Sequence, residues 1–211
     1  MTWIAKHRKQ RIGALTAAII ATVWMPSVMA MPASGLPEGL NSDDVAKNEG
    51  KSNAAHLELD VTKDKSVANW TDFSIAKDHS VNFHRENGGS WQVLNRVTGN
   101  NLSEIYGKLS GDANGTIFLV NPHGITFGAG AQVDVGSFVA STLQITDADF
   151  MDDNYYHFSN NHDKDGNILS NNLDGKIKIL KNAEDVAKIN AKDGYVALLA
   201  LILTALLETY W

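Results

Sequence analysis

Cysteine is absent from this 211-residue chain, and proline occurs only four times. Without cysteine the protein has no disulfides, no thiolate nucleophile and no cysteine-ligated zinc. Helical periodicity is scarce as well, and residues 102–109 are the one stretch whose spacing suggests a helical turn or two. We therefore expect stability to come from core packing and from hydrogen bonds between strands.

The first 30 residues have the pattern of a secretory signal peptide. Four basic side chains lie within residues 6–11, an apolar run covers residues 12–24, and small residues precede a cleavage site after Ala30. An uncleaved membrane anchor is the competing interpretation, but the apolar run is shorter than the roughly 18 residues that suggest a membrane-spanning helix. We predict a secreted or cell-surface protein that leaves a Gram-negative cell through the periplasm and the outer membrane.

The charge balance is acidic. Removal of residues 1–30 takes away four of the 18 basic side chains and none of the 24 acidic ones, which changes the net charge from −6 to −10. A negative surface repels phosphate backbones, so we expect no nucleic-acid partner. The length suits one domain with a sizeable core, and we expect a monomer.

Short strand-like runs separated by Gly, Asn and Asp fill most of the mature chain. Residues 31–66 are polar, apart from an alternating segment at residues 56–61. Further candidate strands follow, at residues 72–75, 80–83, 91–97, 116–120, 124–127, 132–135 and 137–141. This texture predicts an all-β protein.

The spacing of the apolar pairs favours a coiled arrangement of these strands. The pairs recur every eight residues, at Ile117/Leu119, Ile125/Phe127 and Val133/Val135. Gly and Asn between the pairs suit corners, and Pro122 suits the end of a strand because it has no N–H to donate. We favour a β-solenoid on this spacing, and a β-sandwich with closely spaced turns stays open.

Residues 118–142, FLVNPHGITFGAGAQVDVGSFVAST, resemble the signature segment of the filamentous haemagglutinin-type two-partner secretion domain, also called the haemagglutination activity domain. Other segments similar to that family follow its order: LPEG (36–39), NWTDFSI (69–75), VNF (81–83), LNRVTG (94–99), DADF (147–150) and GYVALL (194–199). The resemblance implies a right-handed parallel β-helix with small capping sheets. It also implies the N-terminal secretion module of a large exoprotein of the haemagglutinin or adhesin type.

The partner implied by the resemblance is an outer-membrane β-barrel transporter with periplasmic polypeptide-transport-associated domains. The domain would serve as an address and a folding nucleus, and a passenger would meet the host-cell surface. The motif residues implied by the resemblance are Asn95, Arg96, Asn121, Pro122, His123, Gly124 and Ile125. His123 departs from the family pattern, which has a second Asn there. We expect contact with the transporter through exposed backbone and polar surface near the N-terminal cap and the first coils.

We expect the secretion domain to cover residues 31–199. Residues 200–211 are apolar and do not follow the family pattern. A frameshift or premature stop is one explanation for them. A final buried strand followed by a short capping helix is the other.

The patterns for a metal site and for catalysis are incomplete. Asp163, Asp165, Asn167 and Asp174 match an EF-hand count, but Ile168 stands where the loop needs Gly, so we expect no metal. The seven His lack ligand spacing and are expected to be solvent-exposed. A polysaccharide lyase needs carboxylates clustered with Lys or Arg, whereas Asp134 stands alone and Arg85 and Arg96 lack acidic partners two residues away. We expect no enzyme and no cofactor, and the other alternative is a free-standing adhesin or ligand-binding β-helix.

Overall fold

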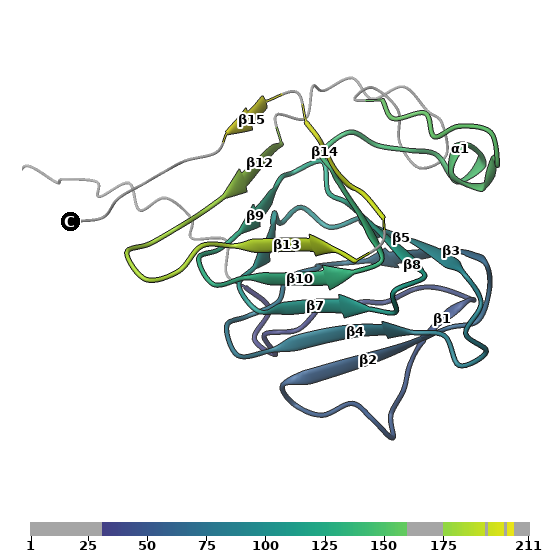
Figure 1. Cartoon of the computed structure of the whole chain (residues 1–211), viewed down its shortest axis with the longest axis horizontal. Coiled ribbons are helices and arrows are strands. Elements are labelled where there is room, and N and C mark those ends of the chain that lie inside the picture. The colour runs from purple at the N-terminus through teal and green to yellow at the C-terminus, as the bar shows by residue number, and fades with distance from the viewer. Residues whose placement is uncertain (1–30, 160–174, 193, 201, 205–211) are drawn as a thin grey trace, which may run out of the picture.

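The computed structural model describes residues 31–159, 175–192 and 194–200, and the backbone of residues 202–204. Within these residues the chain winds through three sheets that form the walls of a coil (Figure 1). The predicted signal peptide and the aspartate-rich calcium candidate, Asp163 to Asp174, lie outside the described residues. The described part contains no helix long and apolar enough to cross a membrane.

Each wall of the coil is one sheet. The six-stranded sheet contains β1 (Val45–Lys47), β2 (His56–Val61), β4 (Ser80–His84), β7 (Lys108–Gly111), β10 (Gln132–Val135) and β13 (Lys188–Ala191). The five-stranded sheet contains β3 (Lys65–Trp70), β5 (Trp91–Val97), β8 (Gly115–Val120), β11 (Ser137–Ser141) and β14 (Val196–Leu199). The four-stranded sheet contains β6 (Ser103–Ile105), β9 (Ile125–Phe127), β12 (Lys176–Ile179) and β15 (Ile202–Thr204).

Successive strands pass from one sheet to the next, and each coil lies on the one before it. After β8, β9 and β10 have each joined a different sheet, β11 returns to pair in parallel with β8. The chain makes about four such turns, and Figure 1 shows β4, β7, β10 and β13 as stacked arrows that point the same way. This arrangement confirms the predicted parallel β-solenoid and excludes the β-sandwich.

The alternating side chains fill the interior of the coil. The six residues of the predicted apolar pairs are each at most 1% exposed. They contribute to one core cluster that runs through the coils. Alternation places every second side chain inside, and parallel stacking then brings like side chains above one another. The prediction of the inward pairs is confirmed.

The N-terminal end of the coil is closed by short antiparallel pairings. Strand β1 pairs antiparallel with β2 at the edge of the six-stranded sheet. Two isolated antiparallel bridges, Glu38 with Asp72 and Asn41 with Asn69, tie the preceding segment to the first coil. These pairings cover backbone groups that an open sheet edge would expose.

A second apolar layer covers the outer face of the five-stranded sheet. Residues 142–159 leave the coil after β11 and include α1 (Asp147–Met151). The ring of Phe118, on β8, lies 5.3 Å from that of Phe150 and 5.1 Å from that of Tyr156 between centroids. Because both faces of β8 are buried, its residues read as a continuous apolar run.

Lys65 holds the end of α1 against the sheet. Its Nζ donates to the carbonyl oxygens of Phe150 (3.2 Å) and Asp152 (2.7 Å) and pairs with Asp153 Oδ1 at 3.0 Å. Burial alone would lower the pKa of Lys65, but the hydrogen bond and charge of Asp153, with Tyr156 nearby, raise it above its ordinary value. Lys65 is therefore a charged anchor for the covering segment.

Most of the predicted strands are present, and two expectations are wrong. The strands predicted at residues 56–61, 91–97, 132–135 and 137–141 have the predicted bounds. Residues 102–109 form β6 and the start of β7 instead of a helical turn, because Ser103 and Ile105 point inward and Glu104 points outward. Residues 72–75 make only isolated bridges, although Phe73 and Ile75 are fully buried.

Strands β14 and β15 continue the order of the coils. Val196–Leu199 pairs in parallel with β11, and Ile202–Thr204 pairs in parallel with β12. Residues 205–211 lie outside the described part of the chain. The predicted domain boundary at residue 199 and the origin of the tail stay predictions.

Candidate functional site

The predicted motif Asn121 to Ile125 forms the corner between β8 and β9. The backbone N–H of Gly124 donates to the carbonyl of Asn121 at 3.1 Å, which closes a four-residue turn. The N–H of His123 donates to Asn121 Oδ1 at 2.9 Å. Pro122 follows Asn121 inside the turn, where its fixed φ is accepted. The sequence prediction of a corner at Asn121 and Pro122 is confirmed.

The Asn121 side chain joins this corner to the neighbouring coils. It is fully buried, and its Nδ2 donates to the carbonyl of Asn101 (2.9 Å) and to Ser103 Oγ (3.0 Å) in the preceding coil. Its backbone N–H donates to the carbonyl of Ser141 in the following coil at 2.9 Å. One residue therefore ties three coils together, which is a structural role.

Gly124 adopts a backbone conformation that favours glycine. Its φ is +122°, and a Cβ built there would lie 3.1 Å from the carbonyl oxygen of Lys176 in the next coil. Ile125, the last residue of the motif, is fully buried in the core. The glycine thus permits both the turn and the close approach of the next coil.

His123 is the one residue of the predicted motif with an exposed side chain. It borders a shallow hollow of about 150 Å³ with Gly124, Ile125 and the two lysines of β12, Lys176 and Lys178. The corner uses only the backbone N–H of His123, as shown by its bond to Asn121. The departure from the family's Asn at this position therefore leaves the turn intact.

Asn95 and Arg96 lie on β5, beside β8, and they face opposite ways. Asn95 is fully buried inside the coil, where its Oδ1 accepts from Trp70 Nε1 at 3.0 Å. Its Nδ2 donates to the carbonyl of Phe118 at 3.2 Å. Asn95 thereby satisfies the indole N–H of a tryptophan that has no access to water.

Arg96 faces outward but is covered by the segment after β11, and it is 2% exposed. Its Nη2 donates to the carbonyl of Ile145 (2.8 Å) and pairs with Asp147 Oδ1 (2.7 Å). Its Nη1 donates to Asn69 Oδ1 at 3.1 Å. This ion pair could not be predicted from the sequence, because Asp147 is far from Arg96 along the chain. Arg96 holds the start of α1 against the sheet.

Two acidic side chains, Asp72 and Glu104, lie near the motif corner. Asn101, whose carbonyl accepts from Asn121, donates its own Nδ2 to Asp72 Oδ2 at 3.2 Å. Burial raises the pKa of Glu104 above its ordinary value, and the negative charge of Asp72 raises it further. Burial also raises the pKa of Tyr106, with a contribution from Glu104. The negative charge of Glu104 is therefore unfavourable in the folded state.

We expect Glu104→Gln to stabilise the domain at neutral pH. Because the pKa of Glu104 is raised on folding, its ionisation costs stability as the pH rises through the folded value, and glutamine removes that cost. A gain of a fraction of 1 kcal/mol, reduced by solvent screening, raises Tm by about 1–2 °C in a domain of this size. Thermal melts of both proteins at pH 7 and pH 3.5 measure it, and the gain should vanish at pH 3.5. Glu86→Gln, on an exposed loop, is the matched control; an equal gain there would contradict the explanation.

Polar side chains elsewhere pair across the coils. Arg85 Nη1 lies 2.6 Å from Asp64 Oδ1, and Asp134 Oδ1 accepts from Asn190 Nδ2 at 3.2 Å. Arg85 thus has an acidic partner that is 21 residues away in the sequence and belongs to the loop between β2 and β3. No group of three or more His, Asp or Glu in the described residues is placed to hold a metal ion.

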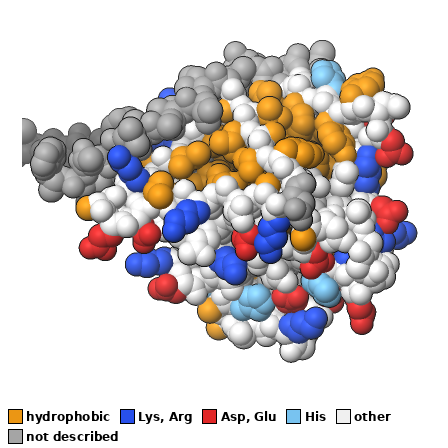
Figure 2. Space-filling view, viewed as in Figure 1, with side chains coloured by type: hydrophobic (Ala, Val, Ile, Leu, Met, Phe, Trp, Pro, Cys, Tyr) orange, Lys and Arg blue, Asp and Glu red, His pale blue; other side chains and the backbone are white. Residues whose placement is uncertain are grey.

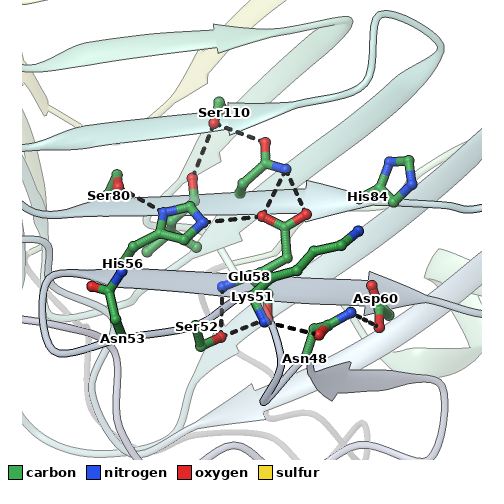
Figure 3. Close-up of polar contacts among 12 residues, drawn as sticks. Asn48, Lys51, Ser52, Asn53, His56, Glu58, Asp60, Ser80, His84 and Ser110 are labelled. Carbon is green, nitrogen blue, oxygen red and sulfur yellow. Dashed lines mark hydrogen bonds and ion pairs between the residues drawn. The ribbon is translucent and has the colours of Figure 1, made fainter.

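A hydrogen-bonded row crosses the outer face of the six-stranded sheet (Figure 3). His56 lies between Ser80 Oγ (2.8 Å from Nδ1) and Glu58 Oε2 (3.1 Å from Nε2). Asn82 Nδ2 also donates to Glu58 at 3.1 Å, and Ser110 Oγ donates to Asn82 Oδ1 at 2.8 Å. This row joins β2, β4 and β7 on their outer face.

The expectation that the histidines are simply solvent-exposed is wrong for two of them. The side chain of His56 is 30% exposed and that of His84 is 35% exposed, and both are bonded to acidic groups. The partner of His84 is Asp112, in the next coil. Stacking of successive coils brings His84 to Asp112, whereas His56 and Glu58 are two residues apart on β2, with their side chains on the same face.

Comparison with protein families decides the assignment. The model of the TPS secretion domain matches residues 39–200, which is most of the chain. This chain belongs to the TPS secretion domain family. The expected membership of a two-partner secretion family is therefore confirmed.

Two curated relatives of this TPS domain are heme/hemopexin-binding proteins of Haemophilus influenzae. One, from strain Rd, is 30% identical over 176 residues, which cover 83% of this chain and 18% of the relative. The other is 34% identical over 95 residues, which cover 45% of this chain and 10% of the relative. The chain thus spans less than a fifth of the length of either relative.

Among solved structures, the TPS domain is similar to the HMW1 secretion domain of Haemophilus influenzae. The TM-score is 0.56 at 23% identity, and the match covers 78% of this chain and 44% of that one. This likeness supports the fold. TPS domains direct export and work with a dedicated transporter, so this chain is a secretion module that belongs to a family of secretion domains.

Proposed function

We propose that this TPS domain is the N-terminal address of a longer exoprotein. After the signal peptide is removed, an outer-membrane β-barrel transporter receives the domain in the periplasm through its polypeptide-transport-associated domains. The passenger then follows and folds onto the domain. We infer that the domain acts by binding and by templating, without catalysis. The observation that carries this proposal is the family match over residues 39–200.

The last coil of the described part supports the templating role. Five apolar residues there pack against the core but are only partly buried: Ile179, Ala187, Ile189, Leu198 and Ala200. Figure 2 shows an apolar area above β13, at the level of β14. A further coil of the passenger would cover these side chains and pair with β13 and β14, as each earlier coil does.

The motif residues divide by exposure. Asn95, Arg96, Asn121, Pro122, Gly124 and Ile125 are all buried, so we propose that they preserve the shape that the transporter reads. His123 alone offers a side chain to a partner. The contact surface itself is then exposed backbone and polar surface of the N-terminal cap and the first coils.

Export with and without the cognate transporter tests this function. The full chain would be produced in a Gram-negative host with the transporter, with a transporter that lacks its periplasmic domains, and with none. We expect the chain in the medium only with the intact transporter, because the domain is its address. Immunoblots of medium and periplasm measure the distribution.

An unrelated periplasmic protein with its own signal peptide controls for leakage. Equal amounts of the chain in the medium without the transporter would contradict the proposal and would favour a free-standing adhesin. Equal export by the transporter that lacks its periplasmic domains would remove those domains from the mechanism.

A further inference from the structure

An open groove crosses the corners between the four-stranded and the six-stranded sheets. It has a volume of about 380 Å³ and is lined by one corner from each of four successive coils. These corners are residues 77–80, 106–108, 129–132 and 182–185. Because paired strands lie about 4.8 Å apart, four stacked corners give a groove roughly 15 Å long that runs along the axis of the coil.

The two ends of the groove carry opposite charge. Lys77 and Lys108 line the first two corners, with Asp78 beside Lys77, and Glu184 and Asp185 line the last corner. Within the described part of the chain, the ion pairs involve none of these five residues. The charges of these five side chains are therefore available to a ligand. Figure 2 shows charged side chains of both signs on the surface of the molecule.

Each of the four corners also carries a neutral hydrogen-bonding side chain. These are Ser80 on the first corner, Tyr106 on the second, Gln132 on the third and Asn182 on the last. Hydroxyl and amide side chains both donate and accept, as the peptide groups of an extended chain require. The groove is thus polar along its length and bipolar in charge.

We propose that this groove binds an extended peptide segment of the transporter's periplasmic domains, with an acidic side chain at Lys108 and a basic one at Glu184 and Asp185. This inference rests on the proposed function. Lys108 and Asp185 belong to corners two coils apart, about 10 Å, and an extended chain rises about 3.3 Å per residue. The segment therefore carries its acid and its base about three residues apart.

The charges favour a peptide over a glycan. A uniformly anionic glycan would meet repulsion from Glu184 and Asp185, and a neutral glycan would leave the lysines and carboxylates at the two ends unmatched. A peptide with both signs satisfies both ends, and complementary charge gives specificity and fast association.

Binding to the full-length transporter in detergent tests the groove. Lys108→Glu and the double change Glu184→Lys with Asp185→Lys should each weaken binding about tenfold, and salt at about 0.5 M should narrow the difference. Lys192 and Asp134, a surface ion pair on the last two coils that lies outside the groove, supply matched controls as Lys192→Glu and Asp134→Lys. Far-ultraviolet circular dichroism and Tm would confirm that all variants fold.

The outcomes separate the two proposals. If the groove variants bind within about twofold of the wild type, as the controls should, the groove assignment is wrong while transporter-dependent export stands. If the controls weaken binding as much as the groove variants, the effect is general charge and the assignment is also overturned. A wild-type chain that does not bind the transporter would overturn both proposals.

Discussion

Asn121→Ala is expected to lower the free energy of unfolding by about 2–4 kcal/mol, because several buried polar groups lose a partner at once. The carbonyl of Asn101, the hydroxyl of Ser103 and the N–H of His123 all bond to the Asn121 side chain. The truncation also leaves a small cavity at a site with no solvent access. Urea unfolding followed by tryptophan fluorescence measures the loss, with Trp70 and Trp91 as buried probes.

Asn190→Ala is the matched control for this change. Asn190 is an exposed asparagine on β13 whose side chain donates to Asp134. We expect a change within about 0.5 kcal/mol there, as for most surface substitutions. We also expect Asn121→Ala to reduce transporter-dependent export, because this corner preserves the shape that we propose the transporter reads. If the variant were as stable as this control, the corner bonds would contribute little to stability, and a loss of export would have no structural cause.

Gly124→Val is expected to destabilise the domain by about 3 kcal/mol and to reduce export more than Asn121→Ala. A branched side chain is strained at a φ of +122°, and its Cβ would lie 3.1 Å from the carbonyl oxygen of Lys176. The corner and the following coil must then shift apart. Urea unfolding gives the stability loss, and immunoblots of the medium give the export.

Gly50→Ala is the control for loss of a glycine as such. Gly50 is exposed, its φ is not positive, and the nearest atom to a Cβ built there, Asn48 Oδ1, is 3.5 Å away. We expect the control to be neutral or slightly stabilising. A Gly124→Val protein with wild-type stability and export would show that the corner tolerates a different turn.

Strong alternation explains which strands the sequence predicts well. Gln132–Val135 and Ser137–Ser141 combine β-branched or aromatic residues with clear turn signals, so their bounds are predicted correctly. The strand Lys65–Trp70 is not predicted because its inward residues include Ser66, which is polar, and Ala68, which is small, so the apolar alternation is weak. Residues 102–109 mimic helical spacing because a corner at Gly107 separates two very short strands.

The motif illustrates what residue type does and does not reveal. Asn121, Pro122 and Gly124 are residue types that favour turns, so they predict a corner, and the structure has one there. Nothing in the sequence pairs Arg96 with Asp147, or Asn95 with Trp70, because those partners come from different coils or from the segment after β11. The resemblance to the secretion-domain family indicated the motif residues, and their contacts in the structure show that they have structural roles.

Alternation and turn chemistry act between near neighbours in the chain, so the all-β class, the inward side chains and the corners follow from the order of the residues. The sheet that each strand joins, the charges that pair and the place of the axial groove follow only from the folded coil. These features depend on the register of one coil upon the next. A shift of one residue in that register would turn every inward side chain outward, so the packed core selects one stacking, and only that stacking places distant residues together.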